Sequence, residues 1–266
     1  MASFSVVSNI SAVNAQANLA TTNIGLQKTL ERLSSGFRIN RSGDDAAGLV
    51  LANGYRSDVA ILSQGVRNAN DGLSTLQIKD GALNNISTLL DRLATLATQS
   101  ASSSLSVDRS ILDSEFQDVL AEIDREANVA GLTSSSGFSI FVSADGSNGT
   151  IGGTIGAADG TTLGVASLDV SSASNAATAL TAISAAVDTL GQAQATVGTI
   201  QNRLTFAITL AQSQITSNKA AESRIRDANI AEESANLTRY SILTQSGIAV
   251  LAQANQQSGA VLSLLR

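Results

Sequence analysis

Two pairs of adjacent carboxylates are the residues whose type and spacing could support acid–base chemistry. They are Asp44-Asp45 and Glu232-Glu233. General acid–base catalysis needs carboxylates whose surroundings move their pKa values apart. Because Arg38 and Arg41 precede the first pair and a predicted helix follows it, ion pairing and a position at a helix N-terminus account for these carboxylates better. For the second pair, exposure to solvent or to another subunit is the favoured interpretation.

Missing residue types exclude most other catalysis. The chain has no Cys and no His, which removes thiol and imidazole catalysis, disulfides and the softer metal ligands. The segment from Gly43 to Gly48 has the glycines of a phosphate-binding loop, but no Gly-Lys-Ser/Thr follows it. We therefore expect a protein that is not an enzyme, with no catalytic residue, no cofactor and no metal.

The composition also restricts the partners. The 266 residues carry 16 Lys and Arg against 22 Asp and Glu, a formal net charge of −6, and contain no basic run, which argues against nucleic acid. No apolar run reaches the ~18 residues of a membrane span, so no membrane insertion is expected. Residues 1–18 lack the blocks of a secretory signal peptide. Export, if it occurs, is expected to use a route without a cleaved leader.

Heptad spacing of apolar residues predicts long helices that wrap around each other. No proline forces a helix to stop, and only eight aromatic residues are available for a core. The first series is Leu62, Ala69, Leu76, Leu83, Leu90 and Ala97. The second is Ile183, Val187, Leu190, Gln194, Val197, Gln201, Leu204, Ile208, Ala211 and Ile215. A repeat of 3.5 residues held this long is typical of coiled-coil packing, in which Gln194 and Gln201 would fix the register.

The middle of the chain interrupts the helical pattern. Residues 131–164 contain nine of the 21 glycines. Phe138–Val142 and Leu163–Val170 are predicted strands, with turns at Asp145-Gly146 and Asp159-Gly160. The middle is therefore expected to be a small β-rich insertion between two helical halves.

Two shorter segments also depart from a regular helix. Residues 34–43 hold two glycines around β-favouring residues and predict an extended connector. Asn70-Asp71-Gly72 is a hairpin signal, yet the leucine series runs through it, so we interpret it as a strained or locally opened helix.

Both ends of the chain are striped but uncharged. Residues 1–27 and 240–265 carry no charged side chain, and apolar residues recur in both at helical spacing. Many of the other residues are Ala, Ser, Gln and Asn, so an isolated pair of such helices would bury too little apolar area to offset its ordering entropy. We expect these ends to be loose in the free chain and to become ordered among copies.

Several motifs, in order and at both ends, resemble bacterial flagellins. At the N-terminal end these are Leu33–Asn40, Asp44–Leu49, Arg67–Gly72 and Asp80–Leu83; at the C-terminal end they are Glu222–Asp227, Leu251–Gln256 and Val261–Arg266. The resemblance covers about residues 1–131 and 178–266. It implies a mainly α fold, in which the N- and C-terminal halves form a long antiparallel coiled coil and bundle around the β-rich insertion.

The resemblance also implies three layers. Residues 1–45 and 226–266 would form an inner terminal coiled coil with its connector, residues 46–130 and 176–225 an outer helical bundle, and residues 131–175 a small variable insertion. The residues expected to carry self-assembly are Ile10, Val13, Ala17, Ile24, Leu30, Leu33, Arg38, Asp44, Asp45, Leu251, Ala254, Val261, Leu262, Leu265 and Arg266.

The implied function is structural: a secreted subunit that polymerises into the flagellar filament used for swimming. The implied partners are further copies of the chain, the flagellar junction and cap proteins, an export chaperone and the type III export apparatus. A hook–filament junction protein is the alternative, since it resembles flagellin at both ends. Arg92, Leu96 and Glu115 match the family's innate-receptor segment, although Asp91 and Thr95 replace its usual glutamine and glutamate.

Overall fold

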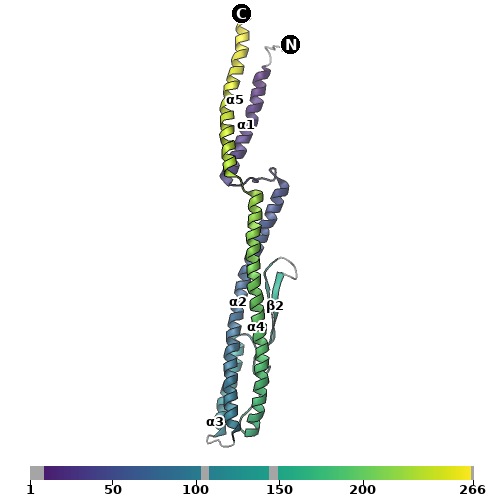
Figure 1. Ribbon diagram of the computed structural model, residues 1–266, viewed down its shortest axis with the longest axis vertical. Coiled ribbons are helices and arrows are strands. Elements are labelled where there is room, and N and C mark those ends of the chain that lie inside the picture. The colour runs from purple at the N-terminus through teal and green to yellow at the C-terminus, as the bar shows by residue number, and fades with distance from the viewer. Residues whose placement is uncertain (1–8, 103–107, 144–148, 265–266) are drawn as a thin grey trace. The chain divides into compact units, whose positions relative to one another are not determined.

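The computed structural model describes residues 9–102, 108–143 and 149–264, with only the helical backbone for residues 257–264. Long helices dominate it, and two short strands lie between the third and fourth of them (Figure 1). In chain order the elements are α1 (Ile10–Ser35), α2 (Ala46–Ala101), α3 (Arg109–Val129), β1 (Ser136–Phe141), β2 (Thr150–Ile155), α4 (Ala173–Arg226) and α5 (Ile230–Leu264). The predicted fold class, mainly α with a small β-rich insertion, is confirmed.

The chain divides into two compact units. The first comprises Met1–Ser57 and Asn218–Arg266, and the second Asp58–Ser217. Each unit thus combines segments from both halves of the sequence. Among the described residues, no helix is both long and apolar enough to cross a membrane.

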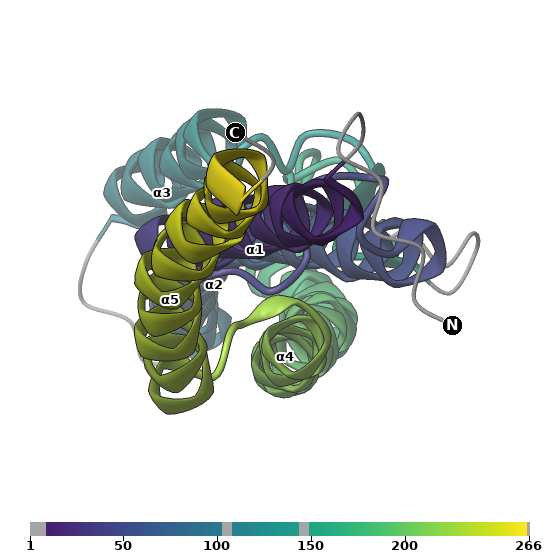
Figure 2. The same cartoon turned by 90° about the horizontal axis from the view of Figure 1, so that it is seen from above.

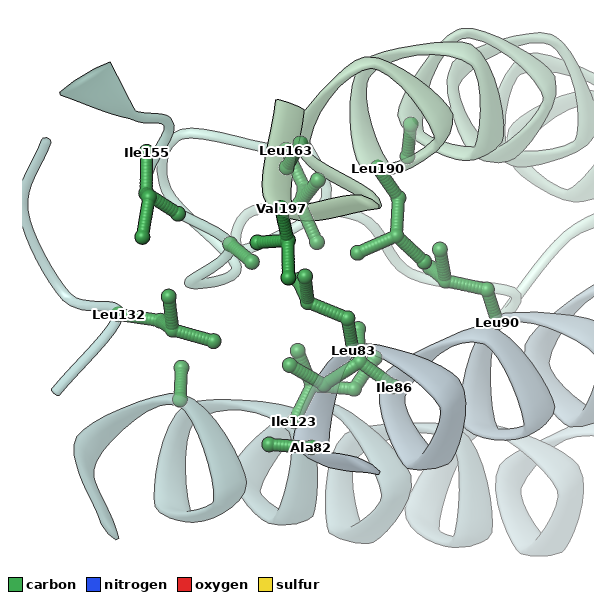
Figure 3. Packing of buried hydrophobic residues seen from close by; sticks show 14 of the residues in the cluster. Ala82, Leu83, Ile86, Leu90, Ile123, Leu132, Ile155, Leu163, Leu190 and Val197 are labelled. Carbon is green, nitrogen blue, oxygen red and sulfur yellow. The ribbon is translucent and has the colours of Figure 1, made fainter. Parts of the chain in front are cut away.

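The second unit holds the hydrophobic core, to which α2, α3, α4 and the insertion contribute. All six residues of the predicted α2 series are buried, from Leu62 to Ala97. Side chains from α3, α4 and the insertion meet them, as Figure 3 shows for Ile123, Val197 and Leu163. The heptad prediction for α2 is therefore confirmed.

The predicted α4 series is correct at every second position only. Ile183, Leu190, Val197 and Leu204 are buried as expected, but Val187 is exposed, and the glutamines lie beside the seam. The buried alternates are Ala186, Ala193 and Ile200, each one residue earlier. Small alanines let α4 approach its neighbours closely, whereas the larger Val187 drew the prediction to the wrong phase. Gln194 does not fill the core; its Nε2 donates to Asn84 Oδ1 at 3.2 Å.

The strands form an antiparallel hairpin, with Ser136 opposite Ile155 and Phe141 opposite Thr150. This confirms the first predicted strand. The second, Leu163–Val170, was wrong, because its residues make local turns: Leu163 N–H donates to Asp159 O, and Gly164 has a φ of 73°. The turn at Asp159-Gly160 is therefore present, while Asp145-Gly146 lies outside the described residues.

The hairpin packs directly on α2 at two glycines. A Cβ built on Gly65 would lie 1.7 Å from the carbonyl oxygen of Val142, and one on Gly72 would lie 2.8 Å from Ile140 Cγ1. Asn68, between them, donates from Nδ2 to Phe141 O at 3.2 Å. Only glycine permits this close approach.

The predicted opening of α2 at Asn70-Asp71-Gly72 was wrong. The helix is continuous there. Asn70 donates from Nδ2 to Val66 O, and Ser74 donates from Oγ to Asn70 O. Gly72 serves the contact with the hairpin rather than a turn, which explains a turn-like sequence inside a regular helix.

Candidate self-assembly site

The first unit is built around the antiparallel pairing of α1 and α5, which lie next to each other (Figures 1 and 2). Asn9 caps α1 by accepting from Ala12 N–H at 3.0 Å, and its Nδ2 donates to Ala254 O at 2.8 Å. At the other end, Gly36 ends α1 in the left-handed region, with φ of 74°, and donates from its N–H to Arg32 O. Both ends of α1 are thus capped, and the cap at its N-terminus also binds α5.

The interface between α1 and α5 buries little apolar area. The buried apolar residues on these two helices, among those whose side chains are described, are Ala15 and Ala254, and the buried polar ones are Thr29 and Glu233. Larger residues such as Tyr240 are only half-buried. The pair therefore lacks the core that would stabilise it as an isolated unit.

Large apolar side chains face solvent on both helices instead. They are between 45 and 67% exposed: Ile10, Val13, Ile24 and Leu30 on α1, and Ile230, Ile242, Leu243, Ile248 and Val250 on α5. Single exposed apolar residues are normal, but nine large ones on two paired helices with a small core are more than a solvent-facing surface usually carries.

The predicted assembly residues fall into several environments. Ile10, Val13, Ala17, Ile24 and Leu30 are exposed on α1. Leu33 and Leu251 are half-buried, and Ala254 is buried between the helices. Val261 and Leu262 lie in α5, where only the backbone is described, and Leu265 and Arg266 lie outside the described residues.

The sequence prediction missed five exposed apolar residues of α5: Ile230, Ile242, Leu243, Ile248 and Val250. These lie off the heptad positions that face α1, and a search for a single seam passes over them. For the four within residues 240–265, the signal was the uncharged composition of that stretch, in which apolar residues stand on more than one face; Ile230 lies outside it.

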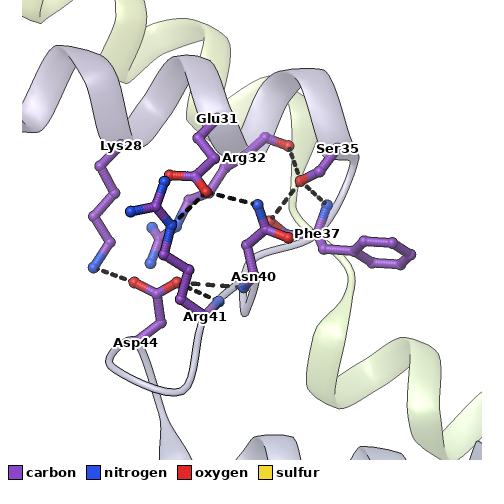
Figure 4. A network of polar contacts seen from close by, with 8 residues as sticks. All are labelled: Lys28, Glu31, Arg32, Ser35, Phe37, Asn40, Arg41 and Asp44. Atoms are coloured by element: carbon purple, nitrogen blue, oxygen red, sulfur yellow. Dashed lines mark hydrogen bonds and ion pairs between the residues drawn. The ribbon is translucent and has the colours of Figure 1, made fainter.

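The connector after α1 is held by a network of charges (Figure 4). Asp44 Oδ1 lies 2.7 Å from Lys28 Nζ, and Asp44 Oδ2 accepts from the backbone N–H groups of Asn40 and Arg41. These contacts, the one with Lys28 foremost, lower the pKa of Asp44 to about 2. Glu31 Oε1 accepts from Asn40 Nδ2 and Arg41 Nε, both at 2.8 Å.

The two connectors of the unit are also bonded to each other. Phe37 and Asp227 form an isolated antiparallel bridge. Arg38 N–H donates to Arg226 O at 2.6 Å, and the Arg226 guanidinium lies 4.1 Å from the centre of the Phe37 ring. The expected extended connector is present for residues 37–40 only. Ser34 and Ser35 still belong to α1, and residues 41–44 form a turn in which Asp44 N–H donates to Arg41 O at 2.9 Å.

The carboxylate pairs have structural roles. Asp45 Oδ1 accepts from Gly48 N–H at 2.9 Å at the start of α2, as the helix-terminus interpretation predicts. The ion pair of Asp44 is with Lys28, not with either of the expected arginines. The interpretation of Glu233 as solvated or facing another subunit was wrong: it is buried and lies 2.9 Å from Arg32 Nη1. Among the described residues, no cluster of acidic side chains could hold a metal ion.

The predicted receptor segment is only partly on the surface. Arg92 of α2 and Glu115 of α3 form an exposed ion pair through two guanidinium nitrogens. Leu96 is 1% exposed and belongs to the core of the second unit.

One unit with paired terminal helices and open apolar faces, and a second, helical unit that carries a small hairpin, define an association-prone structural protein. Two family profiles match it: "Bacterial flagellin N-terminal helical region" over residues 6–144, and "Bacterial flagellin C-terminal helical region" over residues 180–265. The chain therefore belongs to the bacterial flagellin family. The N-terminal match extends beyond residue 131, where the sequence resemblance ended.

Two sequence relatives agree with this assignment. A flagellin of Halalkalibacterium halodurans is 36% identical over 97% of this chain and 98% of its own length. The "Flagellar filament 33 kDa core protein" of Treponema phagedenis is also 36% identical, over 97% of this chain and 98% of its own. A crystal structure of Bacillus cereus flagellin, 30% identical, has a TM-score of 0.49 and covers 59% of this chain and 94% of that chain.

The family membership makes the chain a structural subunit of the flagellar filament. These matches give no support to the alternative of a hook–filament junction protein.

Proposed function

We propose that this chain polymerises through the exposed apolar faces of α1 and α5, which pack against the same helices of neighbouring copies. The observation that carries the proposal is the imbalance in the first unit. Nine large apolar side chains on these helices face solvent, while the interface between the helices buries mostly small or polar residues. Polymerisation supplies the missing core.

Burial of the exposed apolar side chains supplies enough free energy to drive polymerisation. Burying one large aliphatic side chain contributes roughly 1.5–3 kcal/mol when it starts fully exposed, so about half of that applies here. Nine such residues contribute on the order of 10 kcal/mol per copy before the cost of association. The part of α5 that follows Arg239 can be buried without desolvating a charge, because residues 240–265 carry no charged side chain.

The proposed layers follow from the same assignment. Residues 1–45 and 226–266 form the inner layer with its connector, residues 46–130 and 176–225 the outer bundle, and residues 131–175 the variable insertion. The charged residues of the connector, which include Arg38, Asp44 and Asp45, fix the ends of the inner-layer helices. We assign them no role in binding a ligand from solution. The buried seams of the second unit support a self-contained bundle.

By family, we also assign export through the type III flagellar apparatus with a chaperone, an extracellular location, and contacts with junction and cap proteins at the filament ends. The complete lack of cysteine is compatible with export as an unfolded chain, because no disulfide has to form before or after passage. Recovery of the chain from culture medium of a strain with and without a working export apparatus tests this assignment.

For the innate-receptor segment, the exposed Arg92–Glu115 pair is the part that a receptor can reach. We therefore assign any recognition by an innate receptor to the side chains of Arg92 and Glu115. The buried Leu96 makes no direct contact with the receptor in this assignment. A receptor reporter assay on Arg92→Ala, with Arg67→Ala as an exposed arginine control on the same helix, tests the assignment. Equal responses from the two variants would contradict it.

Elongation of short filament seeds tests the proposed function. The full chain should extend the seeds under electron microscopy. A chain truncated to residues 1–239, which lacks most of α5, should not, although its second unit remains complete. A full chain that stays monomeric while seeds from a related flagellin elongate normally would contradict the proposal.

A further inference from the structure

The apolar pattern of the terminal helices leaves their alignment undecided. Heptad positions of α5 include Tyr240, Gly247 and Ala254, so a slide of seven residues would still present heptad positions to α1. Little apolar area is buried between the two helices to penalise such a slide. Weakly patterned pairs need specific side chains to choose one register.

Two glycine contacts favour one register of α1 against α5. Gly25 of α1 lies against Tyr240 of α5, since a Cβ built on Gly25 would be 2.7 Å from the ring atoms Cε1 and Cζ. Gly247 of α5 lies against Leu19 of α1, with a Cβ position 3.0 Å from Leu19 Cδ1. A large side chain on one helix thus enters a gap that a glycine leaves on the other, once in each direction.

A buried ion pair continues the same alignment. From Gly25, one step of seven residues along α1 leads to Arg32, and one step back from Tyr240 along α5 leads to Glu233, its partner at 2.9 Å. Beyond the helix ends, the bridge between Phe37 and Asp227 keeps the alignment in the connectors.

We propose that these contacts form a register lock, consisting of Leu19, Gly25, Arg32, Glu233, Tyr240 and Gly247. The lock restricts α1 and α5 of one chain to a single alignment. This inference rests on the proposed filament function, because a helical polymer requires every copy to present the same apolar faces to its neighbours.

Slipped alignments lose these contacts in both directions. A shift of one heptad one way places Tyr240 opposite Leu19, two large side chains where a glycine is now. The opposite shift places Gly25 opposite Gly247, which leaves a gap, and moves Tyr240 to Arg32. Overpacking and cavities both destabilise an interface, so neither slipped register competes with the native one.

A disulfide reporter can read the register. The hydrogen bonds from Arg38 N–H to Arg226 O and from Ala228 N–H to Gly36 O flank the bridge between Phe37 and Asp227. Opposite residues at such a site have Cα atoms about 4.5 Å apart, which suits a disulfide. Because the chain has no cysteine, Phe37→Cys with Asp227→Cys introduces one reporting pair.

The reporter chain is polymerised as a minor component with unmodified chain, sedimented, oxidised mildly, and scored for the intrachain disulfide. Adding Leu19→Ala and Tyr240→Ala removes both large side chains and should lower the disulfide yield about tenfold. Gln16→Ala with Gln245→Ala is the matched control, because both residues are exposed, one on α1 and one on α5, and neither belongs to the lock or to the apolar assembly faces. The control should leave the yield unchanged.

An equal yield from the Leu19/Tyr240 reporter and the control, both within sedimented polymer, would overturn the lock. If the double variant does not enter the polymer, the disulfide yield of the Tyr240→Ala reporter is compared with that of the control in the same way. Polymer formation by unmodified chain is scored separately. Failure of the proposed function therefore appears as missing polymer, and failure of the lock as an unchanged yield within polymer.

Discussion

Replacing Gly65 with alanine should separate the hairpin from α2. The added Cβ would lie 1.7 Å from the Val142 carbonyl oxygen and 2.5 Å from its carbon, both backbone atoms. Ordinary contacts of this kind are longer than about 3 Å, so either the strand end or the helix must move by more than 1 Å. The same movement strains the bond from Asn68 Nδ2 to Phe141 O.

Two opposing effects set the magnitude. Alanine favours the helix over glycine by roughly 1 kcal/mol, and overpacking against a backbone costs about 1–3 kcal/mol beyond that gain. Gly65→Ala should therefore destabilise the second unit by about 1–3 kcal/mol net. Gly81→Ala is the matched control in the same helix, since nothing lies within 4 Å of its added Cβ. It should stabilise by up to about 1 kcal/mol.

Urea unfolding followed by far-ultraviolet circular dichroism measures both variants. The reasoning requires shifts of opposite sign, with Gly65→Ala unfolding at lower and Gly81→Ala at higher urea than the natural chain. A Gly65→Ala chain as stable as Gly81→Ala would refute the close approach of hairpin and helix.

Three further predictions concern other parts of the chain. Arg32→Met leaves the buried carboxylate of Glu233 unpaired and should weaken the pairing of α1 and α5 by about 2–3 kcal/mol. Arg41→Met, which removes an exposed ion pair, should weaken it by less than about 1 kcal/mol. Hydrogen exchange of the α1 amides in filaments measures both variants. Because the pKa of Asp44 falls from 3.8 to about 2 on folding, its stabilising contribution is complete above pH 4 or so and is lost as the pH falls toward about 2. Asp44→Asn should remove that dependence from amide exchange of the connector in an acid titration. Phe116→Ala empties a fully buried site in the core and should cost about 3–5 kcal/mol in urea unfolding, whereas Phe206→Ala, 74% exposed, should change stability by less than about 0.5 kcal/mol.

The sequence was sufficient for the elements whose residues repeat with large apolar side chains. The series from Leu62 to Ala97 predicted the buried face of α2 correctly, because leucine at every seventh position leaves one choice of phase. In α4 two of the three alternate core positions, Ala186 and Ala193, are alanines, which contribute little to an apolar pattern, and the larger Val187 misplaced the seam by one residue.

The remaining errors come from contacts between residues distant in sequence. Gly72 was interpreted as part of a strained or locally opened helix, because nothing in the local sequence shows that Ile140 packs against it. Glu233 was expected at the surface, since its partner Arg32 lies in the other half of the chain. Assembly residues were predicted on both terminal helices, but on α5 they were taken from a single heptad series, which passes over the exposed Ile242 and Ile248. The exposed faces of α5 follow from the alignment of two helices, which composition alone does not specify.

Electron cryomicroscopy of filaments grown from this chain, at side-chain resolution, tests the central claim most directly. The account predicts that Ile10, Val13, Ile24 and Ile242, all at least 60% exposed in the single chain, are buried against α1 or α5 of neighbouring copies. Filaments in which these side chains still face solvent, with copies joined through the second unit alone, would contradict it.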